Sequence, residues 1–268
     1  MNAVPAGPIL CCEDVSREFV TERKAIIGTP KKKFLAVNGV SLCIEAGETV
    51  GIVGESGSGK STLGEILGGL REPTRGTVRF RGVALKDMDE GQYQRYRRNV
   101  QFIFQDPKGS MHPQFRIRQI IGEPLLTLKI CSDRAQRRQL VKDMIDQVGL
   151  EEGTAEKYPS ELSGGQCQRV AIARALIVHP KIIICDEPVS ALDVSVQAQI
   201  LNLLKELQQA HEIAYIFISH DIGVVNYMAD RIIVMNRGSI VETGTAEQVF
   251  YSPVDEYTRK LVASSFAS

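Results

Sequence analysis

One glycine-rich segment restricts the possible folds of this 268-residue chain more than any other feature. Residues 54–61 read Gly-Glu-Ser-Gly-Ser-Gly-Lys-Ser, which matches the G-x-x-x-x-G-K-[ST] pattern of a phosphate-binding P-loop. The segment follows a short apolar run, residues 49–53, that we predict to be a buried strand. It precedes residues 61–67, which we predict to be a helix. This strand–loop–helix order is the context that the motif requires, and it predicts an α/β fold with a P-loop NTPase core.

The same segment carries the residue types that hold the phosphates of a nucleotide. Glycines let backbone N–H groups turn toward one centre, and the start of a helix adds a partial positive charge. We expect Lys60 to reach the β- and γ-phosphates of ATP and the Ser61 hydroxyl to bind Mg²⁺. The predicted phosphate-binding set is Gly54, Glu55, Ser56, Gly57, Ser58, Gly59, Lys60, Ser61 and Thr62.

Composition excludes some classes of function. Lys plus Arg equals Asp plus Glu at 32 each, so nothing supports a nucleic-acid partner, which usually requires a basic surface. No apolar run approaches the roughly 18 residues of a membrane span, so work at a membrane would require a partner. The six cysteines form no C-x-x-C pair. We therefore predict reduced cytosolic thiols, with Cys43 and Cys185 as small buried hydrophobes.

Strand and helix patterns alternate along much of the chain, which predicts a mainly parallel sheet covered on both sides. A polar stretch over residues 20–33 predicts a long surface loop or hairpin tip. The predicted strands cover residues 9–19, 37–44, 49–53, 76–80, 100–104, 181–186, 214–219, 231–236 and 239–243.

Strand patterns vanish between about residues 106 and 160, where helical patterns appear at 117–121 and 134–148. We predict a helical subdomain inserted there. The remaining helices are expected at 195–208, 246–251 and 256–263, so that short helices occupy about 245–268. Residues 1–268 are thus expected to form a single domain, with an N-terminal antiparallel β subdomain and the inserted helical subdomain added to the core.

A fully apolar strand ends in two adjacent carboxylates, Asp186 and Glu187. We expect Asp186 to hold Mg²⁺. Glu187 points in another direction and is placed to orient an attacking water or to accept its proton. The alternative is a strand that merely ends in acidic residues.

Residues 162–166, Leu-Ser-Gly-Gly-Gln, begin a second helix with the features of an anion site. Ser163 is the expected N-cap, and the first N–H groups and the helix dipole favour an anion. The P-loop alone is sufficient to bind the γ-phosphate of one nucleotide. We therefore predict that this second anion site binds a nucleotide held by another subunit. The alternative is a plain capped helix.

The Leu-Ser-Gly-Gly-Gln segment resembles the signature of ATP-binding-cassette (ABC) ATPases, and the resemblance covers about residues 9–263. It implies a head-to-tail pair of cassettes, in which Ser163, Gly164, Gly165 and Gln166 of one chain complete the ATP site of the other.

Further positions resemble landmarks of the same family. Gln105 resembles a glutamine that touches Mg²⁺ and water, His220 a switch histidine that contacts the γ-phosphate, and Asp193 part of a loop at the dimer interface. Phe19 resembles the aromatic residue that stacks on adenine, with Phe34 as the competing candidate. The catalytic set that we expect is Glu187, His220, Lys60 and Gln105, and the metal set is Ser61, Gln105 and Asp186.

Residues 104–113, 158–169, 186–199 and 252–258 resemble one branch of this family, the oligopeptide, dipeptide and nickel importers. The resemblance implies a Mg²⁺-dependent ATPase subunit that powers uptake of peptides, nickel or metal chelates. It also implies a peripheral position on the cytoplasmic face of the inner membrane. His112 and Gln114 depart from the branch pattern, near the expected contact with a membrane subunit.

The partners that this branch implies are a second, usually different, ATPase subunit and two integral membrane permease subunits. An extracytoplasmic solute-binding protein would deliver the solute. The alternatives are an ABC exporter or lipid-transport ATPase, and a soluble ABC ATPase with no transport role.

Overall fold

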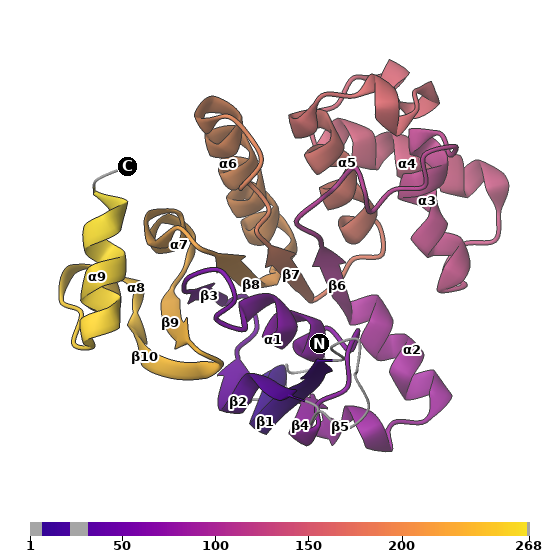
Figure 1. Ribbon diagram of the computed structural model, residues 1–268. Helices are drawn as coiled ribbons and strands as arrows, with labels where there is room; N and C mark the ends of the chain where they lie inside the picture. The colour runs from indigo at the N-terminus through magenta and orange to yellow at the C-terminus, as the bar shows by residue number, and fades with distance from the viewer. Residues whose placement is uncertain (1–6, 22–31, 267–268) are drawn as a thin grey trace, which may run out of the picture. The chain divides into compact units, whose positions relative to one another are not determined.

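The computed structural model describes residues 7–21 and 32–266 (Figure 1). The chain forms two compact units, residues 1–89 with 218–268 and residues 90–217, and each is described by itself. The loop predicted over residues 20–33 lies mainly outside the described residues, although strands continue to Thr21 and begin again at Lys32.

The first unit contains an antiparallel sheet, which confirms the predicted N-terminal β subdomain. Its strand order is β2-β1-β4-β5. Along β1, Leu10 and Cys12 are buried while Glu13 is exposed, as expected for side chains that alternate between the faces of a sheet. The strands are β1 (Leu10–Thr21), β2 (Lys32–Ile44), β4 (Arg75–Phe80) and β5 (Val83–Ala84), followed by a short 3-10 helix (Leu85–Asp87).

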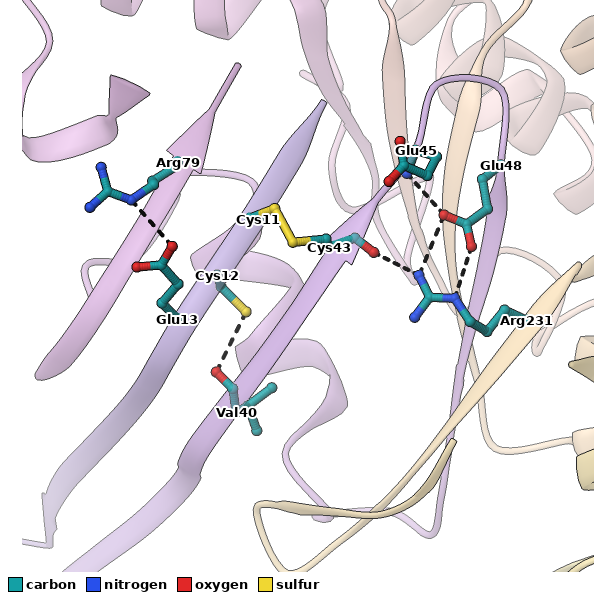
Figure 2. Close-up of a disulfide and its surroundings, with 9 residues drawn as sticks. All are labelled: Cys11, Cys12, Glu13, Val40, Cys43, Glu45, Glu48, Arg79 and Arg231. Atoms are coloured by element: carbon teal, nitrogen blue, oxygen red, sulfur yellow. Dashed lines mark hydrogen bonds and ion pairs between the residues drawn. A yellow bond between two sulfur atoms is a disulfide. The ribbon is translucent and has the colours of Figure 1, made fainter. Parts of the chain in front are cut away.

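Cys11 and Cys43 form a disulfide between β1 and β2 (Figure 2). They lie directly opposite each other in the strand pairing, with Cα atoms 4.1 Å apart. The prediction of a buried Cys43 is wrong, because Cys43 is exposed between its buried neighbours Leu42 and Ile44. The prediction of reduced thiols is wrong for this pair as well. Sequence alone did not show the strand register that brings the two sulfurs together.

The first unit also holds the strands that carry the P-loop. Strand β3 (Thr49–Val53) is buried throughout and pairs in parallel with β9 (Arg231–Asn236), which pairs antiparallel with β10 (Ser239–Thr245). The predicted strands 49–53 and 231–236 are confirmed. The helices of this unit are α1 (Lys60–Leu67), α7 (Ile222–Met228), α8 (Ala246–Tyr251) and α9 (Glu256–Ser265).

The second unit combines buried strands with helices. Strand β7 (Ile182–Asp186) lies between β6 (Val100–Ile103), to which it is parallel, and β8 (Ala214–Ser219), whose last two residues belong to the first unit. Helices α3, α4 and α5 pack on one another (Figure 1). The helices are α2 (Glu90–Asn99), α3 (Ile117–Thr127), α4 (Arg134–Gln147), α5 (Gly164–Leu176) and α6 (Val194–His211), with 3-10 turns at Glu152–Glu156 and Pro159–Glu161.

The helices differ in how well their sequences predict them. Helix α6 was predicted from five apolar positions at helical spacing, and it buries four of them, Ile200, Leu203, Leu204 and Leu207, while the fifth, Val196, is half-buried. Helix α2 buries only Tyr96 and is otherwise polar, so it carries no apolar stripe that a sequence search would find. Among the described residues, no helix is both long enough and apolar enough to cross a bilayer.

Candidate active site

The P-loop connects β3 to α1 in the first unit, and two of its glycines are required by close backbone contacts. Gly59 has a φ of 104°, and a Cβ at this position would lie 2.2 Å from the carbonyl oxygen of Ala36 on β2. A Cβ on Gly54 would lie 2.2 Å from the carbonyl oxygen of Met235 on β9. Because only glycine fits at such distances, the loop sits directly against two strands.

Lys60 is buried at the first position of α1. Its ammonium group donates hydrogen bonds to the carbonyl oxygens of Gly54 at 2.6 Å and Glu55 at 2.8 Å. A buried charge is costly unless it is hydrogen-bonded, and the loop backbone provides these bonds. The loop is therefore already folded around a cation, as a phosphate site requires.

The two candidate adenine-stacking residues lie side by side, because Phe19 on β1 pairs with Phe34 on β2. The guanidinium carbons of Arg17 and Arg71 lie 5.2 Å and 5.1 Å from the centroid of the Phe19 ring. These distances are typical of cation–π contacts. Phe34 is 54% exposed, whereas Phe19 is half-buried. Of the two rings, Phe34 is thus the more open to a ligand.

His220 is exposed directly after β8, in a turn that is fixed on both sides. The N–H of Asp221 donates to the Ser219 hydroxyl at 3.0 Å. The Asp221 carboxylate then caps α7 by accepting the N–H groups of Gly223 and Val224. This seven-residue helix escaped sequence analysis, although the Asp221 cap was a signal that could have revealed it.

In the second unit, the structure brings Gln105 and Glu187 together. Glu187 follows β7 and has a φ of 47°, a conformation that few residues other than glycine adopt. The Nε2 atom of Gln105 donates to Oε2 of Glu187 at 2.9 Å. Asp186, the last residue of β7, is only 8% exposed. The two predicted carboxylates thus occupy different environments at one strand end.

Helix α5 begins as the sequence predicts. The Ser163 hydroxyl accepts the Gln166 N–H at 3.3 Å, and the Gln166 side-chain oxygen accepts the Ser163 N–H at 3.0 Å. This reciprocal pair is a capping box. A Cβ on Gly165 would lie 2.7 Å from Cγ1 of Val196 on α6, so the glycine allows the helix start to approach α6 closely.

A pocket of about 170 Å³ in the second unit is lined by residues that follow β6 and β7 and by residues of α5. Gln105, Glu187 and the signature residue Gly164 all contribute to its wall. Cys167 and Gln168 also line it, and sequence analysis assigned neither of them a role. Asp193, another predicted site residue, is the N-cap residue of α6 and directly follows Leu192, which lines this pocket.

Sequence analysis also missed a contact in the first unit. The Tyr257 hydroxyl oxygen accepts the N–H of Glu55, in the P-loop, at 2.8 Å. Tyr257 lies 202 positions further along the chain. The segment 252–258 was a signal for this contact, but the sequence was interpreted there only as a marker of the family branch.

These features define a class of protein. A P-loop at a strand–helix junction, a carboxylate pair after a buried strand and a second capped glycine helix start are together typical of a nucleotide-hydrolysing ATPase.

Comparisons with known proteins are consistent with this class and narrow it. Residues 37–190 match the model of the ABC transporter family. The oligopeptide transport ATP-binding protein OppF of Escherichia coli (strain K12) is 46% identical over 98% of this chain and 80% of its own length. The di/tripeptide transport ATP-binding protein DppF of Pseudomonas aeruginosa (strain UCBPP-PA14) is 42% identical over 96% of this chain and 79% of its own length.

Solved structures show the same fold. The dimeric, post-hydrolysis form of the ATP-binding cassette MJ0796, bound to ADP and Pi, is 32% identical with a TM-score of 0.77. That comparison covers 88% of this chain and 98% of the other. The chain therefore belongs to the ABC transporter family, and it binds and hydrolyses ATP. The predicted family and fold class are confirmed.

Proposed function

We propose that this chain is the ATPase subunit of a transporter that imports peptides. The observation that carries the proposal is its identity of 42–46%, over 96–98% of its length, to relatives named as oligopeptide and di/tripeptide transport ATP-binding proteins. These names favour peptides over nickel or metal chelates as the solute. They also favour peptide transport over the lipid-transport and soluble alternatives.

The active form that we propose is a head-to-tail pair with a second ABC ATPase subunit. Ser163, Gly164, Gly165 and Gln166 would face the γ-phosphate of the ATP held by that partner. The Ser163 hydroxyl accepts the Gln166 N–H but keeps its own proton, which it can donate to an anion. Asp193, at the neighbouring start of α6, would lie at the subunit interface.

The P-loop would hold the phosphates of ATP on this chain. The Lys60 ammonium group would donate to phosphate oxygens as well as to the carbonyl oxygens of Gly54 and Glu55. N–H groups of residues 56–62 would donate to the same phosphates, whereas the Glu55 N–H donates to Tyr257. Because Phe34 has the more open ring, it is a stronger candidate than Phe19 for the adenine-stacking residue.

Ser61, Gln105 and Asp186 would hold Mg²⁺. They offer a hydroxyl, an amide and a carboxylate oxygen, which are the ligands that this ion prefers, so the donor set fits the ion. When bound, Mg²⁺ would neutralise charge on the phosphate oxygens. The Gln105 side chain donates through Nε2 to Glu187, which leaves its Oε1 atom as an acceptor.

Glu187 and His220 would act on the reacting groups. The Glu187 carboxylate would orient the attacking water and accept its proton at Oε1 or Oε2. His220 would stabilise the negative charge that develops on the γ-phosphate. In this proposal the chain contributes positioning and electrostatics, and no covalent intermediate forms on it.

The partners that we propose are two integral membrane permease subunits, with this chain bound peripherally at the cytoplasmic face of the inner membrane. An extracytoplasmic solute-binding protein would deliver the peptide. Residues 106–160, the proposed helical subdomain, would contact a permease subunit. His112 stacks on Phe115 there, with ring centroids 4.1 Å apart, and Phe115 remains 40% exposed. The unusual His112 would thus influence the choice of permease through Phe115.

The proposal is tested by purifying the intact complex through a tag on this chain and reconstituting it in vesicles with its binding protein. We expect dipeptides or oligopeptides to stimulate ATP hydrolysis and to accumulate on the side that carries the ATPase. Stimulation by nickel or a metal chelate, without any by peptides, would contradict the proposed solute. Purification without membrane subunits would contradict the transporter assignment.

A further inference from the structure

One peptide group of the P-loop is held from both sides by side chains. Its carbonyl oxygen belongs to Gly54 and accepts a hydrogen bond from the Lys60 ammonium group at 2.6 Å. Its N–H belongs to Glu55 and donates to the Tyr257 hydroxyl oxygen at 2.8 Å. A single amide plane therefore connects Tyr257 to the lysine that we propose to bind phosphate.

The two hydrogen bonds strengthen each other. A cation bound to the carbonyl oxygen of an amide polarises the group, so that its N–H becomes a better donor. The bond to the ammonium group is itself charge-assisted and stronger than a neutral one. Loss of the Tyr257 hydroxyl would thus loosen the peptide on which the Lys60 ammonium rests.

Tyr257 is fixed in turn by hydrogen bonds at the start of α9. The Asp255 carboxylate accepts the Tyr257 N–H at 2.8 Å and caps the helix. Glu242 on β10 accepts the N–H groups of Val254 at 2.8 Å and Asp255 at 3.0 Å. Burial alone would raise the pKa of Glu242, but the hydrogen bonds that it accepts lower it, so the carboxylate stays charged at neutral pH.

The segment 252–258 and the P-loop are therefore joined along two routes within the first unit. One route is the direct hydrogen bond from Glu55 to Tyr257. The other runs through the sheet, because Glu242 lies on β10, β10 pairs with β9, and β9 pairs with β3, which leads into Gly54. Helices α8 and α9 contact β10 along this route (Figure 1).

We propose that Tyr257 is a positioning residue of the ATPase. Its hydroxyl holds the peptide between Gly54 and Glu55 so that Lys60 meets the phosphate oxygens in the correct place, and it acts without touching the nucleotide. The inference rests on the proposed phosphate-binding role of the P-loop. The proposal assigns the segment 252–258 a role in ATP binding through Tyr257.

The variant Tyr257→Phe removes the hydroxyl and keeps the ring. In the purified transporter complex we expect the KM for ATP to rise about threefold to tenfold, the effect of one lost hydrogen bond, while kcat stays within about twofold. The affinity of the full-length chain for a fluorescent ATP analogue should fall by the same factor. Tyr251→Phe is the matched control, because Tyr251 lies on α8 and is 70% exposed. It should change neither value.

A folding defect would produce a different pattern, since fewer active molecules lower kcat at an unchanged KM. That pattern, or an unchanged KM and affinity, would overturn the proposal. Amide hydrogen exchange at Glu55 gives a readout that does not depend on activity. Exchange should be faster in Tyr257→Phe than in the wild type and in Tyr251→Phe, and equal rates would also overturn the proposal.

The variant Lys60→Ala tests the phosphate-binding role of the P-loop separately from the positioning role of Tyr257. If Lys60→Ala binds ATP as tightly as the wild type, the result contradicts the phosphate-binding role of the P-loop and therefore also the positioning role of Tyr257. If Lys60→Ala loses affinity while Tyr257→Phe binds normally, only the role of Tyr257 is overturned. Weaker binding by both variants, with normal binding by Tyr251→Phe, supports both statements.

Discussion

The side chain of Gln105 donates a hydrogen bond to the carboxylate of Glu187 at 2.9 Å. The backbone of Glu187 is held in a left-handed conformation, which costs a residue with a side chain about 1–2 kcal/mol. The N–H and the hydroxyl of Ser190 donate to the Glu187 carbonyl oxygen. Such strain persists where the surroundings enforce it. The protein's own contacts therefore set the direction of the carboxylate.

Replacing Glu187 with Gln should leave ATP binding intact and reduce turnover by at least ~100-fold, the low end for loss of a general base. The amide keeps an oxygen that can accept the hydrogen bond from Gln105, so the geometry is retained while the basic group is lost. Steady-state ATPase assays and nucleotide titrations of the complex measure both effects. Glu212→Gln is a suitable control, because Glu212 also has a left-handed backbone. Near-normal turnover would remove Glu187 from the role of base.

Replacing Ser163 with Ala should lower turnover of the assembled pair about tenfold or more, because a donor to the partner's γ-phosphate is lost. ATP affinity of the chain's own P-loop should not change. Thr245→Ala separates catalysis from stability, because Thr245 caps α8 with the same reciprocal pattern and either substitution costs about 1 kcal/mol of helix capping. Equal turnover in the two variants would show that Ser163 serves only as a helix cap.

Replacing Gly59 with Ala should destabilise the protein by about 2–4 kcal/mol, since it combines a strained φ with overpacking against the Ala36 carbonyl oxygen. Gly57→Ala provides a comparison in the same loop. Gly57 also has a positive φ, 80°, but a Cβ there would meet nothing within 4 Å, so the cost should be only about 1 kcal/mol. Urea unfolding of the two variants measures the difference. Similar losses of stability would contradict the close contact with Ala36.

Stability should decline in alkaline solution through Cys12. Burial raises the pKa of its thiol from 9.0 to about 11, so the folded state keeps a proton that the unfolded state releases. The free energy of unfolding should therefore fall as the pH rises from about 9 to about 11, with no contribution from this group below pH 9. Cys12→Ala should show a shallower slope in urea unfolding over this interval. Parallel slopes for the two proteins would contradict the assignment to Cys12.

Local features were predictable wherever one short segment determines them. The P-loop, the Ser163 cap and the buried strand before Asp186 all follow from spacing and residue type within about ten positions. Features that depend on strand register or on contacts across the chain were not predictable. The Cys11–Cys43 bond requires the pairing of β1 with β2, and the bond between Glu55 and Tyr257 joins residues 202 positions apart. Helix α2 was not predicted because it buries only Tyr96 and so has no apolar stripe, and helix α7 was missed although its Asp221 cap is a local signal.

The covalent link between Cys11 and Cys43 closes residues 11–43 into a ring. A single proteolytic cut inside that ring would produce two fragments that remain one molecule until a reductant is added. The strand that carries Phe19 would then stay tethered to the strand that carries Phe34. Under oxidising conditions, a nicked protein would therefore migrate as intact on a gel and separate only after reduction.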